Sequence, residues 1–229
     1  MTAEPRGGFF LTFEGLDGSG KTTQIRRLDA WLAERGIAHV ITRQPGGTVT
    51  GDRIRALLLD SKSTALSPHT ELAMMFADRA QAIQEVIAPA LAAGQLVVCD
   101  RFTDSTEAYQ GGGRELGSEV VRELHRLLCG DLQPDLTILL LPDLETSIKR
   151  ARRRNTRQTA ETGADENRFE REQADFFARV YSKYREIAAR ELVRVVTIEG
   201  NLSLDEVHAQ VIRAVGERLP QGVETSPAG

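Results

Sequence analysis

The feature that most constrains the fold is residues 9–23, FFLTFEGLDGSGKTT, in which an apolar run leads into a glycine-rich loop. Gly15, Gly20, Lys21 and Thr22 fit the pattern G-x-x-x-x-G-K-[ST], whose backbone amides surround a phosphate group. The apolar run is typical of a buried strand, and apolar residues at helical spacing follow the loop. The sequence therefore predicts a strand, a phosphate-binding P-loop and a helix in direct succession.

Each part of this loop has an expected role. Lys21 is expected to place a point charge on the β and γ phosphates of a nucleotide, and Thr22 to offer its hydroxyl to Mg²⁺. The start of the following helix adds partial positive charge. The predicted ATP-binding residues are Gly15, Leu16, Asp17, Gly18, Ser19, Gly20, Lys21, Thr22 and Thr23.

Composition narrows the class of protein. A net charge of −4 argues against a general nucleic-acid binder, so no nucleic-acid partner is expected. The two cysteines, Cys99 and Cys129, lie in apolar surroundings and are interpreted as core thiols of a reducing compartment. The first residues lack a signal-peptide core, and no apolar run approaches the ~20 residues of a membrane helix. We expect a cytoplasmic protein without membrane contact.

Short apolar segments alternate with helical patterns along the chain. The expected strands are residues 9–13, 38–42, 95–99, 136–141 and 194–198. Continuous apolar strands between helices favour a parallel sheet covered on both faces. We expect an α/β fold with a five-stranded parallel sheet flanked by helices, forming one domain over 9–219. Residues 1–8 are expected to be flexible, and 220–229 to be a disordered tail.

Ligands of such sheets bind at the carboxyl ends of the strands. The P-loop, the loop RQPGGT after the second strand and Asp100-Arg101 after the third should therefore line one edge. Asp100 suits a contact with Mg²⁺ or its water, and Arg101 would face an anionic group. The alternative is a structural salt bridge between these two neighbours.

An arginine-rich segment, KRARRRNTR, follows the fourth strand. A phosphoryl group in transfer needs positive charge on its oxygens and exclusion of water, and an arginine-bearing lid supplies both. We predict a lid over about 150–168, with Arg152, Arg153 and Arg154 as catalytic candidates beside Lys21 and Arg101. The alternatives are an exposed basic face or an RNA-binding patch.

A further group of polar residues exceeds what ATP alone requires and could frame a second anionic ligand carrying a ring. Its members are Arg55, Arg79, Arg101, Ser105, Thr106, Tyr109 and Gln110. Phe76 precedes Arg79 by three positions and shares its helical face, so its ring could stack on a base while the arginine bonds the base edge. A core position is the alternative for Phe76.

Several segments together resemble the thymidylate kinase family of the nucleoside-monophosphate kinase group. They are FEGLDGSGKTT, TRQPGGT, ADRAQ, DRFTDSTEAYQGGGR, PDLTILL and NRFE, and they span most of the chain. The resemblance implies a five-stranded parallel sheet, a homodimer, and Mg²⁺-dependent transfer of a phosphoryl group from ATP to dTMP.

The resemblance also implies roles for individual residues. Asp17 would bond the 3′-hydroxyl of the acceptor, while Arg55 and Arg101 would hold its 5′-phosphate. Arg79 would bind the thymine edge. Thr106 would lie beside base and sugar, as would Tyr109, which would also favour deoxyribose.

Some positions depart from the family pattern. Gly18 stands where some members carry an arginine, which implies the bacterial subtype whose arginines come from the lid. Gln44, expected at the acceptor, stands where the family more often has a glutamate, and Met75 stands where it often has a phenylalanine. Asn167 replaces an aspartate at the end of the lid.

Other activities remain open from the residues alone. The chain could phosphorylate dUMP, CMP or a nucleoside instead of dTMP. It could also be a P-loop ATPase switch that hydrolyses ATP without an acceptor, or a silent scaffold, although intact Lys21, Thr22 and Asp100 speak against the last. The absence of an N-K-x-D motif disfavours a GTPase.

Overall fold

A computed structural model describes residues 7–60, 66–151, 153, 168–169, 172–199 and 201–220. Several predictions fall outside these described residues. They are the predictions for residues 1–6, for the tail from 221 on and for most of the lid. Arg152, Arg154 and Asn167 belong to this part of the lid.

All five strands pair in parallel in the order β2-β3-β1-β4-β5, which confirms the predicted sheet. The strands are β1 (Phe9–Glu14), β2 (His39–Arg43), β3 (Leu96–Asp100), β4 (Leu136–Leu141) and β5 (Val195–Glu199). The central strand β1 is buried along its whole length, and Thr12 lies opposite Cys99 on one side and Thr137 on the other. Both cysteines are free and buried, as predicted.

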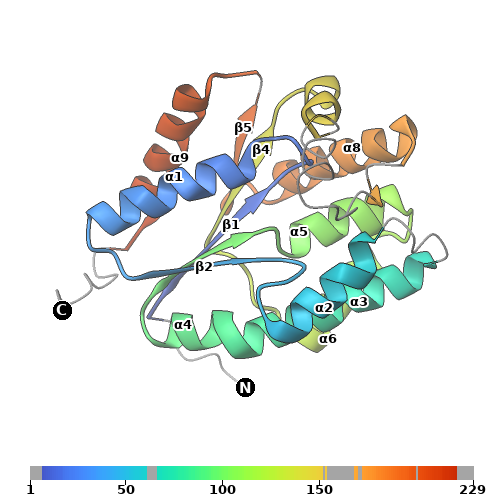
Figure 1. Ribbon diagram of the computed structural model, residues 1–229, viewed down its shortest axis with the longest axis horizontal. Coiled ribbons are helices and arrows are strands. Elements are labelled where there is room, and N and C mark those ends of the chain that lie inside the picture. Colours follow the sequence, from blue (N-terminus) through green and yellow to red (C-terminus); the bar gives the residue numbers. More distant parts are fainter. Residues whose placement is uncertain are drawn as a thin grey trace.

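Helices cover both faces of the sheet (Figure 1). They are α1 (Lys21–Glu34), α2 (Val49–Leu59), α3 (Pro68–Ala82), η1 (Ile83–Ile87), α4 (Ala88–Ala92), α5 (Thr103–Thr106), η2 (Glu107–Gly113), α6 (Ser118–Cys129), α8 (Ala174–Arg190) and α9 (Leu204–Arg218), where η1 and η2 are π-helical. Residues 144–151 form a further helical segment. Ser67 and Ser203 cap α3 and α9 through side-chain oxygens that accept backbone N–H bonds.

The alternation of side chains along β1 explains how the two faces are filled. Leu11 and Phe13 pack with Leu28 of α1 and with apolar residues of α9 in one core cluster. Phe10 points to the opposite face and packs with Leu91 of α4. On that face, side chains of α8 and η2 cover the β4 half of the sheet. Successive strand residues therefore serve two separate cores.

The glycine run at 111–113 lies inside η2, although glycine is an unfavourable residue within a helix. The packing of η2 on α8 gives the reason. A Cβ at Gly113 would lie 2.5 Å from the Phe176 ring, and one at Gly112 would lie 2.8 Å from Lys183 Cβ. The glycines are needed for close approach between two helices, a use that local sequence signals do not distinguish from a turn.

Candidate active site

The chain's connections bring several loops to one edge of the sheet. Strands β2 and β3 lie on one side of β1 in the sheet, and strands β4 and β5 lie on the other side. The switch point is therefore at β1, where ligands of open parallel sheets bind. The P-loop leaves β1 at this edge and leads into α1 (Figure 1).

The P-loop has the backbone geometry that its glycines permit. Gly15 adopts a φ of 132°, and a Cβ there would lie 2.2 Å from the Leu140 carbonyl oxygen. Lys21 is buried, and its Nζ donates to the carbonyl oxygens of Gly15 and Leu16, at 3.0 Å each. Burial first, and then the Arg101 charge, lower the pKa of Lys21 to about 8. The ammonium is thus held inside the loop rather than extended into solvent.

Asp100 and Thr22 are the predicted metal residues. Asp100 ends β3 at the same edge, and its buried Oδ1 has no hydrogen-bond partner among the described residues. Thr22 lies in the first turn of α1. Within the described part of the chain, no cluster of three or more His, Cys, Asp or Glu side chains could hold a metal by itself. One carboxylate and one hydroxyl fit Mg²⁺, which takes most of its remaining ligands from phosphates and water.

Arg101 has a positive φ of 73°, which is uncommon for a residue with a side chain. Its backbone N–H donates to Phe13 O at 2.9 Å, and its Nη2 donates to Asp17 Oδ1 at 3.0 Å. Nη1 donates to Ser105 Oγ at 3.0 Å, and the guanidinium lies 5.1 Å from the centre of the Tyr109 ring. The ion-pair partner of Arg101 is thus Asp17 of the P-loop, and the alternative of a salt bridge to neighbouring Asp100 does not hold.

Glu14 is a fully buried carboxylate beneath Arg101 that the sequence interpretation missed. Its Oε1 accepts the Phe102 N–H at 2.7 Å, and its Oε2 accepts a bond from the Ser105 hydroxyl. Burial, followed by the charge of Asp104, raises the pKa of Glu14 to about 7. An acidic residue at the end of an otherwise apolar strand was the available signal.

Arg79 lies almost fully inside the protein, with 1% of its surface exposed. Its Nε donates to Gln44 Oε1 at 2.8 Å, and its Nη2 donates to Thr106 Oγ1 at 2.8 Å and to Phe102 O at 3.2 Å. All three acceptors are neutral. Two donors of this cluster, Arg79 Nη1 and Gln44 Nε2, have no partner in the described part of the chain.

Phe76 requires a correction of its expected role. The ring is 0% exposed, packs with Leu72 and Val121 in a core cluster, and lies 4.9 Å from the guanidinium of Arg79. It supports the arginine from within the core and presents no free face for stacking. Met75, one position earlier, is partly exposed.

The remaining predicted acceptor residues lie on the neighbouring segments. Arg55 on α2 donates to Pro45 O at 3.0 Å, in the loop after β2. Tyr109 Oη donates to Asp17 Oδ2 at 3.5 Å. Gln110 is buried and donates to Glu71 Oε1 at 2.8 Å. Tyr109 thus lies beside Arg101 and Asp17, whereas Arg55 contacts the loop after β2 and Gln110 contacts α3.

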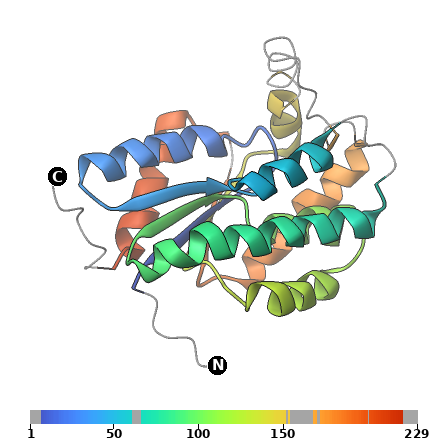
Figure 2. The same cartoon turned by 60° about the horizontal axis from the view of Figure 1, so that its bottom comes forward.

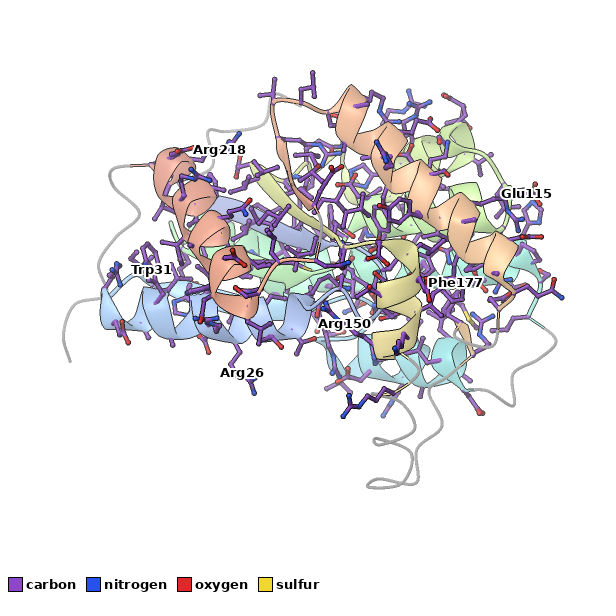
Figure 3. All side chains as sticks on the ribbon, turned by 90° about the horizontal axis from the view of Figure 1, so that it is seen from above. Arg26, Trp31, Glu115, Arg150, Phe177 and Arg218 are labelled. Carbon is purple, nitrogen blue, oxygen red and sulfur yellow. The ribbon has the colours of Figure 1, made fainter. Side chains whose placement is uncertain are left out.

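The helical segment 144–151 rises from the sheet edge after β4 (Figure 2). It presses on the P-loop at Gly18, where an added Cβ would lie 2.3 Å from Ser147 O and 3.1 Å from Arg150 Cβ. Figure 3 shows Arg150 beside the start of α1. Gly18 therefore has no room for a side chain. Arg153, two residues beyond this segment, is exposed.

A five-stranded parallel sheet with a glycine-rich phosphate loop at its switch point and inward-facing arginines beside it defines an α/β nucleotide kinase fold. The family model for thymidylate kinase matches residues 13–211. The chain belongs to the thymidylate kinase family.

Individual relatives agree with this assignment. A thymidylate kinase of Pelobacter propionicus is 45% identical over 208 residues, covering 91% of this chain and 94% of that protein. One of Geobacter sulfurreducens is 46% identical over 215 residues, covering 93% and 99%. The crystal structure of thymidylate kinase from Ehrlichia chaffeensis superposes with a TM-score of 0.72 at 32% identity, covering 92% of this chain and 99% of that one. In the part of this chain that the structure describes, no helix is both long and apolar enough to cross a membrane.

Proposed function

We propose that this enzyme transfers the γ-phosphoryl group of ATP to dTMP and produces dTDP and ADP. The family supports the reaction, since its curated members are named thymidylate kinase. The single structural observation that carries the acceptor assignment is the buried Arg79 cluster. A deeply buried guanidinium held by neutral acceptors and left with a spare donor is suited to a neutral ring with a carbonyl edge.

The base would complete the hydrogen bonds of this cluster. Buried donors without partners cost free energy, about 1–3 kcal/mol each, so a ligand that satisfies them gains affinity. Thymine offers carbonyl oxygens to Arg79 Nη1 and Gln44 Nε2. Thr106 already accepts from Arg79, which leaves its hydroxyl proton free to donate to the ring.

The acceptor phosphate and sugar would engage the second arginine. Arg101 and Arg55 would hold the 5′-phosphate, and the phosphate would compete with Asp17 for Arg101. Asp17, released in part from this contact, would accept a bond from the 3′-hydroxyl. Tyr109, packed beside both residues, would bound the 2′ face of the sugar.

In the transfer itself an oxygen of the dTMP phosphate forms a bond to the γ-phosphorus while the bond to the β-γ bridging oxygen breaks, and ADP leaves with that oxygen. An acceptor phosphate oxygen is nucleophilic at neutral pH, so positioning and charge supply most of the rate. Lys21 and Arg101 would neutralise the phosphoryl oxygens. Thr22 and Asp100 would hold Mg²⁺, which would supply positive charge to the phosphates of ATP.

Coupled detection of ADP with and without dTMP tests the proposal directly. We expect ADP release to depend on dTMP. ADP release that is indifferent to dTMP would instead indicate an ATPase switch. Comparing dTMP with dUMP, dCMP and dGMP as acceptors separates thymidylate kinase from a kinase of another nucleotide, because a preferred acceptor other than dTMP would overturn the substrate assignment.

The arginine-rich segment is proposed to supply a further charge to the transferring group. An in-built arginine finger elsewhere contributes about 10³-fold or more to kcat. We therefore expect one of Arg152→Ala, Arg153→Ala or Arg154→Ala to lower kcat by about that factor. Arg26→Ala, an exposed arginine on α1 (Figure 3), serves as the control. Wild-type kcat in all three variants would exclude the role.

We also propose a homodimer. Helix α3 contacts both α2 and α6. Exposed large apolar side chains lie on these two neighbouring helices and are Val49, Leu57, Val120, Leu127 and Leu128. Light scattering on the double variant Leu127→Glu/Leu128→Glu should report a monomer, whereas Leu204→Glu on α9 should stay dimeric. A wild-type monomer would contradict the proposal.

Two broader expectations remain proposals. One domain over 9–219 accords with the single sheet. A cytoplasmic location accords with the free thiols of Cys99 and Cys129.

A further inference from the structure

Glu71 on α3 is a fully buried carboxylate that the proposed reaction does not use. A buried carboxylate must be paired and hydrogen-bonded to remain charged. Its partners are Gln110 Nε2 at 2.8 Å, Arg114 Nη2 at 3.1 Å and Arg168 Nη1 at 2.8 Å. One side chain therefore joins α3, the end of η2 and residues 168–169, which follow the arginine-rich segment in the chain.

The first consequence concerns Gln110. A carboxylate only accepts hydrogen bonds, so the amide NH₂ must face Glu71, and the orientation of the Gln110 amide is determined by this contact. Arg114 strengthens the same junction, because it also pairs with Glu172 at 2.6 Å. The turn that ends η2 is thus held by charge-assisted bonds.

The second consequence concerns Tyr109. The guanidinium of Arg168, held by Glu71, lies 4.4 Å from the centre of the Phe169 ring. The Phe169 ring in turn packs edge-on against Tyr109, with 5.7 Å between ring centres. Arg168 also donates to the carbonyl oxygens of Leu58 and Leu59 at the end of α2. Glu71 therefore supports, through Arg168, the Phe169 ring against which Tyr109 packs.

We propose that Glu71 is a positioning residue that sets Tyr109 and Gln110 for the acceptor nucleotide. This inference rests on the proposed function, because Tyr109 reaches Asp17 and Arg101, each at 3.5 Å between polar atoms, on the acceptor side of the site. Loss of the Glu71 charge would remove the ion pair that Arg168 and Arg114 share and leave them with Leu58, Leu59 and Glu172 as partners, so that Phe169 and Tyr109 would be held less firmly. The acceptor side should suffer while ATP binding stays nearly unchanged.

The test compares Glu71→Gln with Glu107→Gln. Glu107 is also buried, lies in η2 and pairs with Arg190 at 2.8 and 2.9 Å, so its variant controls for the general loss of a buried ion pair at the helix that carries Tyr109 and Gln110. We expect Glu71→Gln to raise the KM for dTMP about ten- to hundredfold. We also expect the preference for dTMP over its ribose counterpart, ribothymidine 5′-monophosphate, to fall, with the KM for ATP within about threefold of wild type.

The result that would overturn the proposal is an unchanged preference for deoxyribose in Glu71→Gln, or an equal loss in Glu107→Gln. If Glu71→Gln does not fold, the variant Arg168→Lys tests the role instead. Lysine keeps the positive charge beside Glu71 but cannot also make the contact of Arg168 Nε with the Leu58 carbonyl oxygen. It should lower the same preference to a smaller degree, and an unchanged preference would overturn the role. Absence of dTMP turnover in the wild type would instead remove the proposed function itself.

Discussion

Arg101 Nη2 lies 3.0 Å from Asp17 Oδ1, so the residue after β3 is tied to a variable position of the P-loop. The pair is partly buried, with 15% and 26% of the two side chains exposed. It links the predicted acceptor phosphate site to the nucleotide loop. Because Arg101 also has a positive φ and bonds Phe13 through its backbone, its side chain leaves the strand end in one defined direction.

Asp17→Asn should keep the shape of this contact and remove its charge. We expect kcat/KM for dTMP to fall about ten- to hundredfold, because Arg101 loses its anchor and the sugar loses its acceptor. The KM for ATP should change much less. Steady-state kinetics with each substrate varied measures both, and Asp205→Asn, which breaks the exposed pair with Arg27, should leave both unchanged. Equal losses for ATP and dTMP would contradict a role on the acceptor side.

Gln44→Leu should destabilise the protein by about 1–3 kcal/mol. The reason is that the buried Nε of Arg79 would lose the Gln44 oxygen to which it donates. The KM for dTMP should rise as well, since Arg79 would be free to turn. Urea unfolding gives the stability, and Gln81→Leu on α3, the helix that carries Arg79, should stay within about 0.5 kcal/mol of wild type. A fully stable Gln44→Leu protein would show that Arg79 does not depend on this amide.

Gly18→Ala should damage the P-loop, because φ is 80° there and the new Cβ would lie 2.3 Å from Ser147 O. We expect the free energy of unfolding to fall by about 1–3 kcal/mol. We also expect the KM for ATP to rise by roughly tenfold or more. Gly216→Ala in α9 is the matched control, because an added Cβ meets nothing within 4 Å there. That variant should gain roughly 0.5–1 kcal/mol. Unchanged stability and an unchanged KM for ATP in Gly18→Ala would mean that the segment 144–151 moves away from the new Cβ at little cost.

Glu14 should make stability fall as pH rises. Its pKa is raised from 4.5 to about 7 in the folded protein, so between these values the folded state binds the proton more tightly than the unfolded chain does. The contribution is fully present below pH 4.5 and is lost as pH rises through about 7. Its loss amounts to about 1–3 kcal/mol.

Glu14→Gln should remove this slope. Urea unfolding at pH 5, 6, 7 and 7.5 measures it, and the stability of the wild type relative to Glu14→Gln should decrease over that series. Comparing the two proteins cancels the titration of other groups, such as Asp78, whose pKa burial raises to about 6. Glu217→Gln, at an exposed position, should reproduce the wild-type slope. Parallel curves for wild type and Glu14→Gln would contradict the assignment.

The parts of the site that could be predicted are those encoded by short segments. The P-loop glycines, Lys21 and Thr22 are adjacent, so their spacing alone indicates a phosphate cradle after a strand. The alternation of apolar strands with helices likewise indicated the parallel sheet, because strands buried on both faces need apolar residues throughout. Arg79 and Arg101 were found as polar residues near the expected sheet edge.

The tertiary structure decided which side chains meet. Gln44 and Arg79 are 35 residues apart, and Glu14 and Phe102 are 88 apart, so no local pattern could pair them. Phe76 shared a helical face with Arg79 as expected, yet packing against Leu72 and Val121 turned its ring into core. The sequence by itself determined where phosphate binds and how the sheet is built, since these depend on local backbone geometry and periodic burial. Only the folded chain decided how Glu14 and Glu71 are paired, because the desolvation of a buried charge is offset by partners that folding brings from distant segments.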